Sequence, residues 1–118
     1  MSQTRSQTLL VLTSLPDEAS AQALATALVT ERLAACVNVL APCRSIYRWQ
    51  GAIESTPEVP LLIKSTTARY AALEVANRAR HPYEHPEIVA VPIAHGLPEY
   101  LFWVVAETLL EPADGKPV

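Results

Sequence analysis

The chain has 118 residues and a mass of 12.8 kDa, a size typical of one domain. Its net charge of −3 and isoelectric point near 5.5 argue against a nucleic-acid-binding protein. Only 18% of the residues are charged and 50% are hydrophobic, so we expect copies of the chain to cover apolar surface for one another. No apolar run is long enough to span a membrane, and the run at 9–12 is too short for a signal peptide. We therefore expect a cytoplasmic protein with no membrane or nucleic-acid partner.

The first half of the chain predicts two strands and a helix. Residues 1–7 are polar and aperiodic, which favours a loose N-terminal arm, and the apolar run at 9–12 predicts a buried strand. Pro16 and two acidic residues begin a helix that we expect to end near Leu33. Its apolar stripe is Ala21, Leu24, Ala25 and Leu28. From Cys36 the period changes to two, which predicts a second strand with a bend at Pro42.

A long β-hairpin follows over 44–64. Gln50-Gly51 offers a tight reversal, and alternation places Tyr47 and Trp49 on one face of the outgoing strand. Pro57 and Pro60 in the return strand require bulges or an exposed edge, because proline has no N–H to donate to a sheet. The two cysteines lie outside disulfide range if the segment between them is extended, so two free thiols are expected.

The second half of the chain predicts a helix, a strand and a further helix. Thr66 or Thr67 caps the first helix, which stops at His81-Pro82. Its stripe is predicted at Ala72, Val75, Ala76 and Ala79. Residues 88–93 predict a strand, and a short helix from Pro98 is apolar nearly all round, which favours packing on several sides. Residues 111–118 form a polar tail.

This order of elements is β-α-β-β-α-β with a C-terminal helix, the split βαβ arrangement of a ferredoxin-like sandwich. The predicted fold class is therefore α+β, with an antiparallel sheet, the long hairpin, and both longer helices on one face. We expect a single domain over 8–110. The other sheet face needs cover, which the apolar C-terminal helix and neighbouring subunits would supply.

Candidate metal ligands cluster between the second long helix and the strand after it. His81, Glu84 and His85 are the borderline ligands of this segment, and divalent copper or zinc is the expected ion, bound weakly. The alternative is a rigid connector, because Pro82 and Pro86 prevent the helical geometry that would aim both imidazoles at one ion.

Other side chains suggest an interface or a cleft. Aromatic residues are common interface anchors, so a subunit interface is expected at Tyr47, Trp49, Tyr100 and Trp103. A small-ligand cleft between subunits would need convergent polar groups, for which the candidates are Asn38, Arg48 and Lys64. No catalytic residue is predicted. The alternative is a hydrolase or transferase that uses Cys36, Lys64 or His81 in that cleft.

Several linked segments resemble one known family. They are ACVN at 35–38, SIYRWQG at 45–51, HPYE at 81–84 and PEI at 86–88, in order and at family spacing within 9–109. On these segments the chain resembles the CutA divalent-cation tolerance family. The resemblance implies a ferredoxin-like subunit, a cytoplasmic homotrimer similar to PII signalling proteins, and a link to tolerance of copper and other divalent cations.

The resemblance implies a binding or signalling-adaptor role without an obligatory cofactor, and it supplies no reaction. Some members carry a thiol late in the first strand and a histidine before the His-Pro pair, where this chain has Thr13 and Arg80. Arg80 cannot ligate a cation and Thr13 is a poor ligand for copper. Of that set, only His81 carries over.

Overall fold

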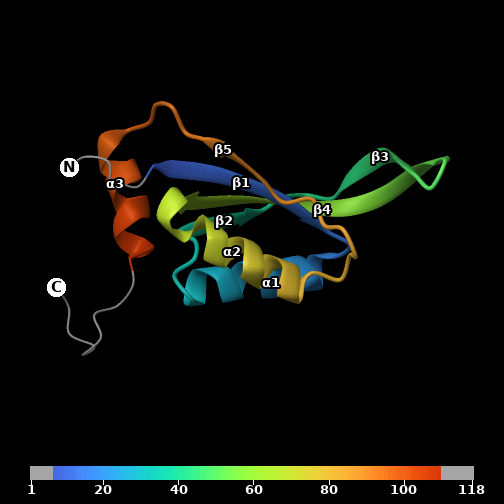
Figure 1. The fold of residues 1–118 in the computed structure, drawn as a ribbon, viewed down its shortest axis with the longest axis horizontal. Coiled ribbons are helices and arrows are strands. Elements are labelled where there is room, and N and C mark those ends of the chain that lie inside the picture. The colour runs from blue at the N-terminus through green and yellow to red at the C-terminus, as the bar shows by residue number, and fades with distance from the viewer. Residues whose placement is uncertain (1–6, 110–118) are drawn as a thin grey trace.

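A computed structural model of the chain describes residues 7–109. It is an α+β fold in which five strands form one antiparallel sheet and three helices pack around it (Figure 1). The elements are β1 (Thr8–Leu15), α1 (Glu18–Thr30), β2 (Cys36–Val39), β3 (Cys43–Trp49), β4 (Ala52–Thr66), α2 (Thr67–Arg80), β5 (Val89–Pro92) and α3 (Pro98–Glu107). The predicted order is confirmed, except that the second predicted strand is divided at the bend into β2 and β3. Most of the expected N-terminal arm and all of the polar tail lie outside the described residues.

The strands are ordered β2-β4-β1-β5, and β3 pairs with the first half of β4. Helices α1 and α2 cover one face of the sheet, α3 lies at one end, and the β3–β4 hairpin extends from the other end (Figure 1). The core lies between the sheet and α1 and α2, and its fully buried side chains include Val11, Leu28, Leu61, Ile63 and Leu73.

Helix α1 follows its predicted pattern. Asp17 caps it, because the Asp17 carboxylate accepts a hydrogen bond from the Ser20 N–H at 2.8 Å. That bond and a second one from the Ser20 side chain hold the pKa of Asp17 below its usual value. The predicted stripe is buried. The helix ends at Thr30 rather than Leu33, since Arg32 adopts a positive φ of 60° that a right-handed helix does not allow.

The predicted stripe of α2 was wrong. The buried side chains are Leu73 and Asn77, with Tyr70 and Ala76 packed beside them, whereas Val75 is 69% exposed. Leu73 and Tyr70 bury far more apolar area than a line of alanines, so their face of the helix turns toward the sheet.

The hairpin contains the expected reversal and bend. Gln50 and Gly51 have φ values of 50° and 83°, as a two-residue type I′ turn requires. Val39 pairs with Leu61 but Cys43 pairs with Glu58, so the segment between β2 and β3 has one more residue than the part of β4 that it faces. This bulge bends the strand at the predicted place. At Pro57, strand β4 pairs with β3 on one side only, because its pairing with β1 on the other side ends at Val59. The missing N–H of Pro57 therefore breaks no hydrogen bond to β1.

Within residues 7–109, no helix lies across the centre of the second face of the sheet. Cross-strand neighbours on this face are only half-buried or exposed, and we call them the open face: Leu10, Leu12, Cys36, Asn38, Leu62, Lys64, Val89 and Val91. Helix α3 buries only Val104 completely, and Phe102 is 75% exposed. The expectation that α3 is packed on several sides is therefore not met within one chain. No helix among residues 7–109 is long and apolar enough to cross a membrane.

Candidate functional site

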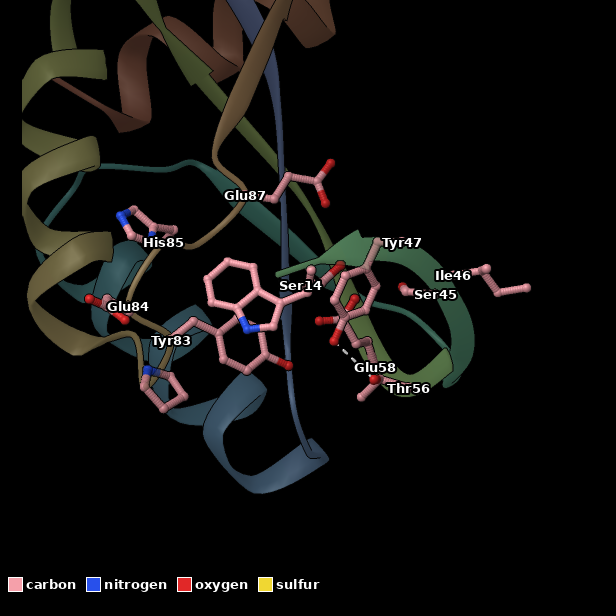
Figure 2. Close-up of a pocket in the computed structure, with 12 residues that line it drawn as sticks. Ser14, Ser45, Ile46, Tyr47, Thr56, Glu58, Tyr83, Glu84, His85 and Glu87 are labelled. Carbon is pink, nitrogen blue, oxygen red and sulfur yellow. Dashed lines mark hydrogen bonds between the residues drawn. The ribbon is translucent and has the colours of Figure 1, made fainter. Parts of the chain in front are cut away.

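A pocket of about 760 Å³ lies between the β3–β4 hairpin and the connector from α2 to β5, residues 81–88 (Figure 2). One wall comes from the hairpin, the other from the connector, and the end of β1 forms the floor. We call this the hairpin pocket; its lining residues are Ser14, Ser45, Ile46, Tyr47, Trp49, Thr56, Glu58, Pro82, Tyr83, Glu84, His85 and Glu87.

Strand alternation builds the hairpin wall. Ser45, Tyr47 and Trp49 lie on one face of β3, and β4 places Thr56 opposite Ser45 on the same face. The Tyr47 hydroxyl and the Thr56 hydroxyl are 3.0 Å apart and share a hydrogen bond, drawn as a dashed line in Figure 2. This bond fixes the ring of Tyr47 against the strand beside it.

His81 anchors the connector wall. Its Nε2 lies 2.8 Å from the Ser14 carbonyl oxygen, and its Nδ1 accepts a hydrogen bond from the Tyr83 N–H at 3.3 Å. These partners require a neutral ring with its proton on Nε2, because a carbonyl only accepts and an amide only donates. Burial lowers the pKa of His81, against opposing effects of Ser14 and Glu58, which favours the same neutral form.

Tyr83 links the two walls. Its ring packs against His81 with the centroids 4.9 Å apart, and its hydroxyl points toward Glu58 on β4. Figure 2 shows Tyr83 reaching from the connector toward Glu58. Burial, followed by the interaction with Glu58, raises the pKa of Tyr83 far above its usual value. Tyr83 is therefore a neutral donor in the pocket at physiological pH.

The pocket carries acidic and aromatic groups together. Glu58, Glu84 and Glu87 line it, and no lysine or arginine does. The indole of Trp49 lies across the pocket from the connector, 6.3 Å from the imidazole of His85 between ring centroids. Such a site can bind and orient a ligand of positive charge.

The structure separates the predicted metal ligands. Glu84 and His85 reach the pocket from the exposed side of the connector, whereas both ring nitrogens of His81 are already engaged. Among residues 7–109, no three His, Cys, Asp or Glu side chains are grouped so that they could hold a metal ion. Metal binding at this connector stays a prediction, and it would have to use fewer than three ligands from one chain.

The predicted cleft residues lie elsewhere. Lys64 donates a hydrogen bond to the Asn38 side-chain oxygen on the open face, whereas Arg48 is a hairpin residue that does not join them. Cys36 pairs across strands with Lys64, and burial, together with a smaller effect of the Cys36 thiol, raises the pKa of Tyr100 on α3. Both thiols are free, as predicted.

Among the candidates for catalysis, Cys36 and Lys64 are cross-strand partners, whereas His81 lies apart from them. Cys36 and Lys64 align with Leu10 of β1, whereas His81 binds Ser14, four residues along the same strand and so about 13 Å away.

The two positions that depart from the family pattern, Thr13 and Arg80, are both engaged in the packing of the fold. Thr13 is buried in the core, and Arg80 pairs with Glu31 at 2.7 Å, which ties α2 to the end of α1.

Sequence reasoning missed Glu58, Thr56 and Glu87 as pocket residues. A signal for two of them existed in the hairpin. Once the turn is placed at Gln50-Gly51, the register puts Thr56 opposite Ser45 and Glu58 opposite Cys43, on the face that carries Tyr47. Glu87 lies in the connector, which is neither helix nor strand, so no sequence periodicity predicts which way its side chain points.

Comparison with known proteins decides the family. The family model described as CutA1 divalent ion tolerance protein matches residues 9–107. The chain belongs to this family. It is 50% identical over 98 residues to the divalent-cation tolerance protein CutA of Thermus thermophilus, an alignment that covers 83% of this chain and 95% of that protein. The relatives are thus named as tolerance proteins rather than as enzymes.

Solved CutA structures share the fold. The crystal structure of CutA from Xylella fastidiosa superposes with a TM-score of 0.84 at 45% identity, covering 86% of this chain and 98% of that one. The Archaeoglobus fulgidus protein, named a periplasmic divalent cation tolerance protein CutA, has a TM-score of 0.84 at 31% identity, covering 86% and 99%. The sequence resemblance to the CutA family is therefore confirmed.

Proposed function

We propose that this CutA-family chain works as a cytoplasmic homotrimer in tolerance of divalent copper and related cations, by binding and signalling rather than by turnover. The single observation that carries this proposal is the open face. Its central side chains Leu10, Leu12 and Leu62 are apolar, yet no helix or strand in the described part of the chain covers the middle of that face.

The arrangement of apolar surface supports assembly from copies of the chain. The open face adjoins α3, on which Tyr100 and Trp103 stack with centroids 5.7 Å apart while both remain partly exposed. At the other end of the molecule Ile53 of the hairpin is 63% exposed. Large exposed apolar patches on soluble chains mark association surfaces, and a two-stranded ribbon is marginally stable alone. Tyr47 and Trp49 are the hairpin residues that we propose for this contact.

Two further features support the proposed comparison with PII trimers. The strand order β2-β4-β1-β5 with two helices on one face is the order that a ferredoxin-like subunit requires. His81 anchors the connector to β1, and later connector residues line the hairpin pocket. A ligand bound there would contact the connector and the hairpin together, so its binding could change the position of the hairpin. From these features we infer an adaptor protein that changes its contacts with partner proteins when a ligand binds in the hairpin pocket.

The assembly is tested by light scattering at micromolar concentration. The proposal expects three times the 12.8 kDa subunit mass. A stable monomer would contradict it, because an interface of this apolar kind leaves no stable free subunit.

The cation is tested by titration calorimetry with copper(II) and zinc. We expect a dissociation constant that is roughly micromolar or weaker, since Glu84 and His85 are too few ligands for tight binding. His85→Ala should abolish the heat, and His95→Ala is the matched control because His95 lies outside the pocket. Tight binding that survives His85→Ala would move the site elsewhere, with Cys36 as the next residue to test.

A further inference from the structure

No acidic side chain of the hairpin pocket takes part in an ion pair within residues 7–109. The ion pairs in the described part of the chain join Arg80 to Glu31 and Arg32 to Glu107, and neither includes a pocket residue. Glu58 lies near the hydroxyl of Tyr83, and Glu84 and Glu87 add negative charge at the rim. Like charges around one cavity repel one another, so a bound cation would be stabilised there.

Aromatic rings line the same cavity. Trp49 is 44% exposed and Tyr47 is 43% exposed, so part of each ring is accessible from the pocket. Tyr83 completes the aromatic lining on the connector side. Ring faces attract cations, tryptophan most strongly, and an alkylammonium group gains apolar contact with the rings that a hydrated metal ion cannot gain.

The size of the cavity selects among cations. A volume of about 760 Å³ falls within the range of small-molecule sites and far exceeds that of a single metal ion. The described residues also offer no three-ligand metal set. Ser14, Ser45 and Thr56 place hydroxyl groups on the wall and floor, where they can bind a polar end of the ligand.

We propose that the hairpin pocket binds a small organic cation, with its alkylammonium group between the indole of Trp49 and the carboxylate of Glu58. The site shares Glu84 and His85 with the proposed metal contact and Trp49 with the proposed subunit contact, but its lining comes from one chain and it requires no metal. The two ideas can therefore fail separately.

Calorimetric titration with choline tests the proposal, in a buffer with EDTA so that metals play no part. The control ligand is 3,3-dimethylbutan-1-ol, which has the shape of choline without its charge. We expect saturable binding of choline and none of the alcohol at equal concentration. Equal binding of both compounds, or no saturable choline binding up to tens of millimolar, about the weakest range for a specific small ligand, would overturn the proposal.

Matched variants locate the site. Glu58→Gln removes the charge while keeping the shape and should weaken choline binding at least about threefold, whereas Glu54→Gln on the same strand lies outside the pocket and should change nothing. Trp49→Leu should weaken binding about 2- to 30-fold and Trp103→Leu should not. Light scattering on each sample reports assembly independently. Equal losses in variants and controls would overturn the placement of the ligand.

Discussion

The two faces of the sheet are built from alternate residues of the same strands, yet they differ in how far one chain completes them. Leu61 and Ile63 of β4 are fully buried beneath α1 and α2, whereas Leu62 between them lies half-buried on the open face. Both faces are apolar at their centres. The difference shows that the described part of one chain supplies cover for one face, and the proposed contacts between chains would explain the apolar composition of the other.

The largest expected effect comes from the covered face. Ile63→Ala should lower the free energy of unfolding by about 2 to 5 kcal/mol, because it leaves a cavity among fully buried neighbours. Ile53→Ala is the control on the same strand, since Ile53 is largely exposed in the hairpin. Urea unfolding checks the pair. Equal losses would show that the two regions do not differ as described.

Next in size is the effect of Trp49 on assembly. Trp49→Ala should weaken the trimer by about 2 kcal/mol or more per subunit while the far-ultraviolet circular dichroism is kept, as for an aromatic interface anchor. Dilution followed by light scattering measures this. A variant that keeps its trimer mass and melting temperature would remove Trp49 from the proposed interface and leave it as a pocket residue alone.

A smaller effect concerns His81, which joins the covered core to the connector. Burial lowers its pKa in the folded chain, so the unfolded chain binds a proton first as the pH falls below about 6.5, the ordinary histidine value. The contribution of His81 to stability is therefore full above that pH and is lost as the pH falls through the folded pKa. Urea unfolding at pH 7.5 and 5.5 should show this loss in the native chain and not in His81→Gln. An equal loss in both would assign it to other groups.

The smallest effect is expected at the start of α1. Asp17→Ala removes the acceptor for the Ser20 N–H and should lower the melting temperature slightly at neutral pH. The lowered pKa of Asp17 means that its contribution is present above the ordinary aspartate value and disappears as the pH falls through the folded pKa. Native chain and variant should therefore have similar melting temperatures in strong acid. A difference that persists there would point to helix propensity instead of the cap.

Much of the fold could be predicted from the sequence because the signals are local. The Asp17 cap, the stripe of α1, the Gln50-Gly51 turn and the break at Pro82 each depend on neighbouring residues. The buried stripe of α2 was mispredicted, because alanines lie on several faces of the helix and the larger apolar side chain of Leu73 was not given enough importance. Which face turns inward depends on area buried against the sheet, and that is a tertiary property.

The candidate site was less accessible to prediction. The sequence pointed to the connector, but the pocket forms only where the connector meets β3 and β4, which are about 30 residues away in the chain. The engagement of His81 by Ser14 also crosses from α2 to β1. Spacing along the chain does not encode such contacts, so the metal hypothesis could not take account of the two bonds that occupy the ring of His81.

One sheet face is completed within the chain, and the proposed assembly completes the other with copies of it. The most direct test compares Leu61→Asp with Leu62→Asp, the same change at adjacent residues on opposite faces. Circular dichroism and light scattering should show that Leu61→Asp unfolds the chain, because it buries an unpaired charge in the core. Leu62→Asp should leave the secondary structure in place and reduce the mass to that of a single subunit. A Leu62→Asp protein that stays trimeric, or a native chain that is monomeric from the outset, would contradict the account.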